Sequence, residues 1–255
     1  MIIHLLASKR ELIQSIHKAF GYWQNIEDTY LLPKQLNAFV GEYYVQQQKG
    51  IANFWILFVE RVNPIVTNNL DMILRAVELD KEIIAQKYIE HPLLYNKRKI
   101  DFQFIVLLRG INPLQGSVYN VCIPRITVNP FSLDNRTLFD SATHCTKEVL
   151  DYKEYIKLFE GEHKDAVSWS NIFADIVNIV REALRGVEVQ YKDIQFGRSR
   201  VIMGVNVMLD EKLVPRLLGF DAEPDLVGLS QMAPDFYNDA FEYLFAETNK
   251  NSYLL

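Results

Sequence analysis

The sequence predicts an α+β protein built on antiparallel sheets, and three observations lead to this fold class. Two stretches, residues 102–123 and 201–220, each pair two apolar segments across turn residues, which is the pattern of β-hairpins. A long segment, residues 168–184, instead repeats its apolar residues with helical spacing. Helices and hairpins interspersed along one chain are typical of α+β proteins with antiparallel sheets.

The first part of the chain alternates predicted helices and strands. Ser8 and Glu11 form a capping box, so a helix is expected to begin at Ser8 and to end near Gly21. A second helix is predicted over residues 33–48, because Pro33 suits a first helical turn. The next predictions are, in order, a strand over residues 54–60, a helix over 70–77 and a strand over 83–88.

The second part contains the two hairpins and the clearest helix. The predicted elements are, in order, strands over residues 102–109 and 118–123, a helix over 168–184, strands over 201–209 and 213–220, and a last helix capped by Asp235. Gly186 is expected to end the long helix. Pro215 has no N–H to donate, so it places its strand at a sheet edge or at a bulge.

Composition excludes several classes of protein. The chain has 255 residues, of which 49% are apolar and 12% aromatic, so it can form a substantial core and is not disordered. A net charge of −5 gives no reason to expect nucleic acid or an anionic membrane as a partner. The apolar start of the chain is too short for a signal peptide or a membrane span. The distant Cys122 and Cys145 fit a reducing compartment, so a cytoplasmic protein is expected.

Several segments carry a resemblance to one enzyme family. QKYIEHPLL, which begins at Gln86, and RKIDFQF, which begins at Arg98, resemble neighbouring motifs of the tubulin–tyrosine-ligase-like family. Further similar segments are TYLLPKQLNAFV near residue 30, KIDFQFIVLLRGINPL from Lys99, and PDFYNDAFEYLF near the C-terminus. The resemblance covers residues 6–245 and is strongest to a divergent branch, member twelve of the series, which carries a SET-like domain before its ligase-like domain.

This resemblance implies an ATP-grasp-like fold, in which two subdomains with antiparallel sheets clamp a nucleotide. Residues 1–98 are then expected to form the central subdomain and residues 99–255 the C-terminal subdomain of one tubulin-ligase-like domain. The family's N-terminal subdomain would precede Met1 and is expected to be missing. Family members are ligases that use ATP and magnesium to join an amino acid to a protein carboxylate.

The resemblance also implies a nucleotide pocket. Its residues, by comparison with the family motifs, are Lys9, Gln86, Lys87, Tyr88, Ile89, Lys99, Asp101 and Arg125. The residue chemistry leaves other roles open, because Tyr88 and Ile89 suit a core equally well and Arg125 suits an ion pair with a carboxylate. Without the resemblance, the lysines would be assigned to the solvated surface.

The catalytic part of the family pattern is altered. Phe58 replaces a phosphate-side lysine, and Gln103 replaces an arginine that could bind phosphate or carboxylate in a bidentate manner. No glycine occurs from Ile51 to Arg109, where the family has a glycine-rich phosphate loop. The positions of the family's magnesium ligands, an aspartate, a glutamate and an asparagine, hold Asn206, Gly219 and Asp221.

The loss of both anionic ligands predicts that magnesium binds poorly, although Glu223 lies close enough in sequence to substitute for one of them. We therefore expect a pseudoenzyme without catalytic residues, metal or cofactor, which acts as a protein-binding or scaffold module. Its partner is expected to be a protein, either tubulin or a larger complex, and neither nucleic acid nor a membrane.

Two alternatives stay open. The chain is either an active ATP-dependent ligase that modifies tubulin or another protein with ATP and magnesium at a rearranged site, or an adaptor that provides only a rigid surface. The family alignment further predicts that Asn206 and Asp221 face the same cleft as Lys87.

Overall fold

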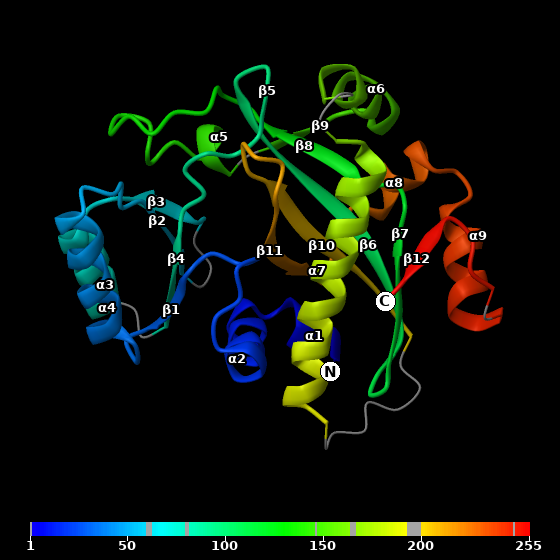
Figure 1. Ribbon diagram of the computed structural model, residues 1–255, viewed down its shortest axis with the longest axis horizontal. Coiled ribbons are helices and arrows are strands. Elements are labelled where there is room, and N and C mark those ends of the chain that lie inside the picture. Colours follow the sequence, from blue (N-terminus) through cyan, green and yellow to red (C-terminus); the bar gives the residue numbers. More distant parts are fainter. Residues whose placement is uncertain are drawn as a thin grey trace. The chain divides into compact units, whose positions relative to one another are not determined.

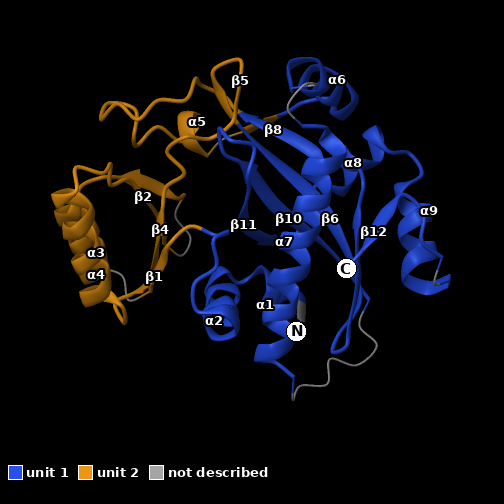
Figure 2. Ribbon diagram, viewed as in Figure 1, with its two compact units in different colours: residues 1–26, 100–126, 149–255 blue, residues 27–99, 127–148 orange. Residues whose placement is uncertain are grey.

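Antiparallel sheets and the helices that pack against them make up the computed structural model (Figure 1), which describes residues 2–59, 63–79, 82–145, 147–163, 167–192, 200–246 and 248–255. The chain forms two units (Figure 2). The first unit contains Met1–Ile26, Ile100–Ile126 and Val149–Leu255, and the second unit contains Glu27–Lys99 and Thr127–Glu148. The predicted α+β class with antiparallel sheets is confirmed.

A four-stranded antiparallel sheet forms the centre of the second unit. Its strand order is β1 (Thr29–Leu32), β4 (Ile83–Lys87), β2 (Trp55–Val59) and β3 (Ile65–Thr67). Helices α3 (Leu36–Gln48) and α4 (Leu70–Leu79) cover one face of this sheet (Figure 1). The core between these layers contains the fully buried Phe39, Trp55, Ile73, Ile83 and Ala85.

The opposite face of this sheet packs against a later segment of the same unit. Val66 and Tyr88 form a cluster with Leu138, and Phe131 packs against it. This later segment includes α5 (Ser141–His144), and β9 (Lys147–Val149) follows it. The short β5 (Leu94–Tyr95) pairs with the first residues of β6 (Arg98–Ile111).

A larger antiparallel sheet organises the first unit. Its order is β11 (Pro215–Asp221), β10 (Val201–Leu209), β6, β7 (Leu114–Tyr119) and β12 (Ser252–Leu254), and β8 (Ile123–Thr127) pairs with the early part of β6. Helices lie on both faces of this sheet. Successive residues of β6 point to opposite sides, so one strand contacts both layers of helices. Phe104 stacks on Phe173 of α7 (Trp169–Gln190) with ring centroids 5.5 Å apart, whereas Ile105 joins the core under α8 (Leu226–Met232) and α9 (Phe236–Phe241).

The other helices of the first unit are α1 (Ile2–Ala7), α2 (Lys9–Phe20), α6 (Tyr152–His163) and the π-helical η1 (Glu242–Ala246), which continues α9. The predicted start of α2 is confirmed, since Ser8 is its N-cap and Ser8 Oγ accepts a hydrogen bond from Glu11 N at 3.4 Å. Both predicted hairpins are confirmed, as β6–β7 and β10–β11. Among the described helices, α1, α5, α6 and α8 were not predicted.

Several predicted boundaries were wrong. Helix α3 begins at Leu36 and not at Pro33, because Gln35 Oε1 accepts a hydrogen bond from Leu31 N at 2.7 Å and so holds a turn before the helix. Strand β11 begins at Pro215, since Leu213 lies in the preceding turn with a φ of 64°. Residue 123 belongs to β8 and not to the second strand of the first hairpin.

Gly186 does not end α7, which continues to Gln190. A Cβ at Gly186 would lie 3.3 Å from Cε2 of Phe20, so this glycine allows α2 and α7 to approach closely. In the predicted strand over residues 54–60, β2 covers Trp55–Val59, and Glu60 lies outside the described residues.

The predicted subdomain boundary at residue 98 stays a prediction. The two units divide β6 at nearly the same place, but the division of the remaining chain differs, because Met1–Ile26 belongs with the later residues. Among the residues that the structure describes, no helix is long and apolar enough to span a membrane.

Candidate functional site

Five polar side chains form a row across four adjacent strands of the first unit. Arg125 of β8 lies opposite Asp101 of β6, and Gln103 of β6 lies opposite Asn206 of β10. Asp221 ends the neighbouring strand β11. Side chains that lie directly opposite on antiparallel strands are close enough to interact. This polar row, comprising Asp101, Gln103, Arg125, Asn206 and Asp221, brings together five of the positions that the family resemblance singled out.

Gln103 connects the middle of the polar row. Its Nε2 donates to Asn206 Oδ1 at 3.2 Å and to Asp221 Oδ2 at 3.0 Å. Its Oε1 accepts a hydrogen bond from the backbone N–H of Asp225 at 3.0 Å. Because a backbone N–H can only donate, this bond fixes the orientation of the amide and directs its NH₂ group toward Asn206 and Asp221.

Arg125 closes the other end of the row. Its Nε donates to Asp101 Oδ1 at 2.8 Å, and its Nη2 donates to Asn206 Oδ1, also at 2.8 Å. The Asp101 side chain is 1% exposed and that of Arg125 is 19% exposed. A buried carboxylate requires such a charged partner, since an isolated buried charge is costly. Arg125 therefore makes the ion pair that the sequence left open.

The oxygens of this row do not fit a magnesium ion. Asn206 Oδ1 accepts from both Gln103 and Arg125, and Asp221 Oδ1 accepts from the backbone N–H of Glu223 at 3.0 Å. Magnesium demands near-octahedral coordination by oxygens, whereas here nitrogen donors point at these oxygens. No group of three or more His, Cys, Asp or Glu that could hold a metal occurs in the described part of the chain.

Two glycines shape the backbone around the row. A Cβ at Gly204 would lie 3.1 Å from Cβ of Asp221 and 3.1 Å from Cβ of Pro224, so only glycine fits there without displacement. Gly219 has a φ of 145°, a conformation that favours glycine. A glutamate at position 219 would thus be strained even though a Cβ there would have nothing within 4 Å. The φ of residue 219 therefore disfavours any side chain there, including the carboxylate that a metal ligand at this position would provide.

Lys9 lies at the start of α2 in the first unit. Its Nζ donates to the carbonyl oxygen of Leu218 at 2.7 Å, one residue before Gly219. Burial of the ammonium group lowers the pKa of Lys9 to about 7. The positive end of the helix dipole at this position also disfavours the charged form.

A second polar cluster lies in the second unit and contains Tyr88, Lys99 and His144. Lys99 Nζ donates to Tyr88 Oη at 2.9 Å and to the carbonyl oxygen of His144 at 2.7 Å. Tyr88 Oη also lies 2.9 Å from His144 Nδ1. Burial, and next the charge of Lys99, lower the pKa of His144 to about 4, so its ring is neutral at pH 7. Because Lys99 can only donate, the Tyr88 hydroxyl can donate in turn to Nδ1.

The remaining predicted hinge residues also have partners within the second unit. Gln86 is 4% exposed, and its Nε2 donates to Thr29 Oγ1 at 2.9 Å. Lys87 Nζ donates to the carbonyl oxygen of Ala52 at 2.6 Å and forms an ion pair with Glu90 at 3.1 Å. Ile89 follows β4 and is half-buried.

The structure thus divides the predicted nucleotide residues into two sets. Lys9, Asp101 and Arg125 belong to the first unit, and Gln86, Lys87, Tyr88, Ile89 and Lys99 belong to the second, to which Phe58 in β2 also belongs. Whether Lys87 shares a cleft with Asn206 stays a prediction. The contacts of His144 with Tyr88 and Lys99 were not predicted, and Gln103 was recognised only as the replacement of an arginine.

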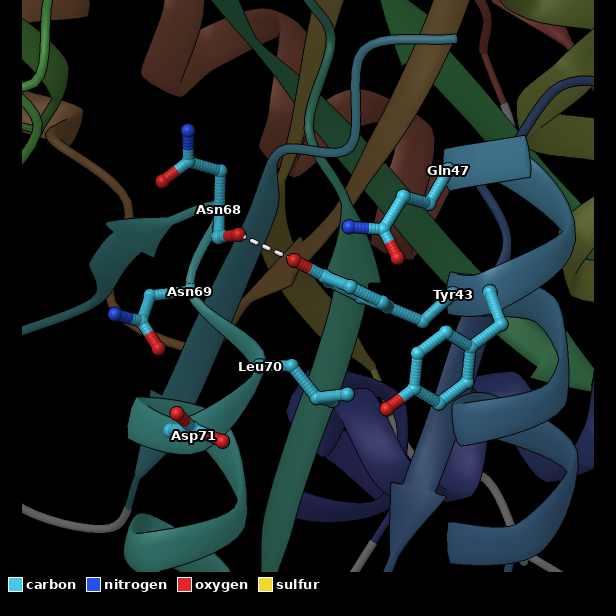
Figure 3. A pocket seen from close by; sticks show the side chains of 7 residues that line it. Tyr43, Gln47, Asn68, Asn69, Leu70 and Asp71 are labelled. Atoms are coloured by element: carbon cyan, nitrogen blue, oxygen red, sulfur yellow. Dashed lines mark hydrogen bonds between the residues drawn. The ribbon is translucent and has the colours of Figure 1, made fainter. Parts of the chain in front are cut away.

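A polar recess of about 350 Å³ lies in the second unit, between α3 and the start of α4 (Figure 3). The Tyr43 hydroxyl points across it and donates to the carbonyl oxygen of Asn68. Gln47, Asn69 and Asp71 also line it. Amide side chains and a lone carboxylate provide neither a nucleophile with its base nor a set of metal ligands, so the polar row stays the candidate site.

Comparison with known proteins assigns the chain to a family. Residues 5–252 match the model of the tubulin-tyrosine ligase family. Tubulin–tyrosine ligase-like protein 12 of Caenorhabditis briggsae is 31% identical over 86% of this chain and 36% of its own length. The protein of the same name from Mus musculus is 29% identical over 89% of this chain and 39% of its own length. Tubulin glycylase 3D of Tetrahymena thermophila is 24% identical over 70% of this chain and 19% of its own length. The chain, which spans less than two thirds of each of these relatives, belongs to the tubulin-tyrosine ligase family.

Proposed function

We propose that this chain is a pseudoenzyme of its family, which binds a protein partner without ligating an amino acid to it. One observation carries the proposal: the Gln103 amide donates to both Asn206 and Asp221, the two side chains left at the family's three metal-ligand positions. These oxygens are therefore satisfied within the protein.

The hydrogen bonds of the polar row are unfavourable for the ligation reaction of the family. A family ligase needs oxygen ligands for magnesium, cations around the triphosphate, and stabilisation of charge as a phosphoryl group moves to a carboxylate. Admitting magnesium would break hydrogen bonds to charged groups, each of which contributes about 1.5–3 kcal/mol. Arg125, the cation of the row, is already paired with Asp101.

Tubulin is the proposed partner, and the cytoplasm is the proposed compartment. Support for tubulin comes from the relatives, which are named as tubulin–tyrosine ligase-like proteins and a tubulin glycylase. Support for the compartment comes from Cys122 and Cys145, which are both free thiols. Co-sedimentation with microtubules tests the partner, and a chain that stays in the supernatant at micromolar tubulin would contradict it.

Mass spectrometry tests the absence of ligation. Tubulin is incubated with the protein, ATP, magnesium and tyrosine, glutamate or glycine, and an active ligase of the family serves as positive control. No mass increment is expected from this chain. An increment that depends on the protein and disappears with EDTA would establish the alternative, an active ligase at a rearranged site.

A thermal-shift titration tests nucleotide binding separately. The protein is heated with increasing ATP, with and without magnesium, and no magnesium-dependent stabilisation is expected at micromolar ATP. If stabilisation is observed and is lost in Asp221→Asn or Glu223→Gln, those carboxylates have rebuilt a metal site and the proposal fails.

A further inference from the structure

The helix formed by α9 and η1 is apolar on two faces. Its buried face packs into the core under the large sheet through Phe236, Ala240, Tyr243 and Leu244, none of which is more than 3% exposed. Its outer face presents Tyr237, Phe241 and Phe245, whose exposed fractions are 50%, 62% and 60%. We call these three residues the aromatic face.

The aromatic face is continuous. The π-helical residues of η1 follow α9 directly, so Tyr237, Phe241 and Phe245 are spaced four residues apart along one helix. Residues three or four apart lie on the same side of a helix. The rings of Phe241 and Phe245 are in contact, with centroids 5.0 Å apart. Figure 1 shows α9 at the periphery of the first unit, next to β12.

Such a face is unusual on a protein surface. A helix at the surface of a soluble domain has one apolar side toward the core and a polar side toward water. Single exposed apolar residues are common, but a contiguous apolar patch marks a site of interaction. Val227 of α8, a helix that contacts α9, is also exposed, with an exposed fraction of 66%.

The surrounding sequence is strongly acidic. Between Leu217 and Asn249 the chain has seven Asp or Glu residues and no Lys or Arg. Asp225 and Asp235 are exposed, and Glu242, which lies between the two phenylalanines in sequence, is paired with Lys250 at 2.8 Å. Opposite charges across an interface direct association, and like charges oppose it. Two arginines contact η1: Arg200 donates to the carbonyl oxygen of Leu244 at 2.6 Å, and the guanidinium of Arg109 lies 5.1 Å from the ring centre of Tyr243. The acidic character is therefore strongest at the other end of the helix, where Asp235 and Tyr237 are both exposed, and that end favours a partner with basic residues.

We propose that the aromatic face is a docking surface for a basic amphipathic helix of a partner protein. Helices of this kind bind apolar surfaces through anchors spaced like Tyr237, Phe241 and Phe245 themselves. A second copy of this chain fits less well, because a two-fold contact would place the same acidic segment against itself. The inference does not depend on whether the chain ligates amino acids.

Peptide binding to the full chain tests the chemistry of this surface. Two fluorescent amphipathic helical peptides are compared, one of leucine and lysine and one of leucine and glutamate. The lysine peptide should bind more weakly as salt is added, and the glutamate peptide should not bind. The double variant Phe241→Ala/Phe245→Ala should weaken binding about tenfold or more, as expected for interface aromatic residues.

Phe139 provides the matched control. It is 61% exposed but belongs to the second unit, so Phe139→Ala should bind the lysine peptide like the wild type. Asp235→Lys keeps all three rings and should weaken the lysine peptide while it strengthens the glutamate peptide. Equal binding by the phenylalanine double variant and the wild type would overturn the proposal. So would equal binding of the two peptides to the wild type.

Photo-crosslinking identifies the natural occupant. A benzoylphenylalanine introduced at position 241 of the full chain is activated in cells, and the crosslinked peptides are sequenced. The proposal expects a helical segment rich in Lys or Arg. Crosslinks to an acidic segment or to a second copy of this chain, or none at all, would overturn it.

Discussion

The two polar clusters both hold partly buried polar side chains, but the residues that satisfy their hydrogen bonds differ in kind. In the first unit, the row from Arg125 to Asp221 contains residues that differ from the family pattern, and these residues bind one another. In the second unit, Tyr88 and Lys99 match the family pattern but are bound within the protein to His144. A matching residue is thus no stronger indication of nucleotide binding than a changed one.

The two units also depart from the family's ligase pattern in different ways. In the first unit, Gly219 has a backbone conformation that suits glycine, and Gln103 is bonded on both sides, so both backbone and side chains differ from what the family's ligands would need. In the second unit, Gln86, Lys87 and Tyr88 are bonded to other groups of the protein without such a change of backbone. The first unit therefore carries the argument against ligation.

The largest expected effect is that of Asp101→Ala, which removes the carboxylate that pairs with Arg125 in the row. Breaking a buried ion pair at one partner costs about 3–5 kcal/mol, because the other charge stays buried. Urea denaturation should show this decrease in the free energy of unfolding. The double variant Asp101→Leu/Arg125→Met removes both charges and should recover most of it. A decrease below about 1 kcal/mol in the single variant would show that the row is not held by this pair.

The cluster of the second unit is tested by Lys99→Met. Methionine keeps the length of the side chain but leaves the carbonyl oxygen of His144 without the Lys99 donor. An unsatisfied buried group costs about 1–3 kcal/mol, and the free energy of unfolding should fall by this amount. Lys49→Met, an exposed lysine of the same unit, is the control and should change it by less than about 0.5 kcal/mol. Equal stability of the two variants would place Lys99 outside the structural core.

Features that depend on residues close in the sequence were predicted, whereas those that depend on distant residues were not. The Ser8 cap and both hairpins follow from neighbouring residues, and the sequence predicted them. The start of α3 depends on the hydrogen bond from Leu31 to Gln35, which no periodicity reveals. The role of Gln103 required the register of β6 against β10, two strands about a hundred residues apart in the chain. The pairing of β8 with β6, which brings Arg125 opposite Asp101, likewise explains why the sequence could not decide whether Arg125 binds a carboxylate or a phosphate.

A smaller effect is expected from Gly204→Ala, which tests how tightly the row is packed. The added methyl group would lie 3.1 Å from Cβ of both Asp221 and Pro224. Overpacking of this kind costs about 1–3 kcal/mol, and it should also displace Asp221 from Gln103. Gly161→Ala is the control, because a Cβ there meets nothing within 4 Å in helix α6. That variant should gain about 0.5–1 kcal/mol, and a gain by Gly204→Ala as well would contradict close packing.

Lys9 offers a test at a single titrating group. Burial lowers its pKa from 10.5 to about 7, so between these pH values the unfolded chain holds a proton that the folded chain has released. Stability therefore rises with pH across this window, and the cost of burying the charged lysine is fully present only below about pH 7. After reductive methylation with ¹³C-formaldehyde, one lysine signal should titrate near neutral pH in NMR spectra, and it should be absent in Lys9→Arg. If every lysine signal titrates above about pH 9, as unperturbed lysines do, the ammonium group is hydrated. The contact between Lys9 and Leu218 would then add no constraint to the strand that carries Gly219.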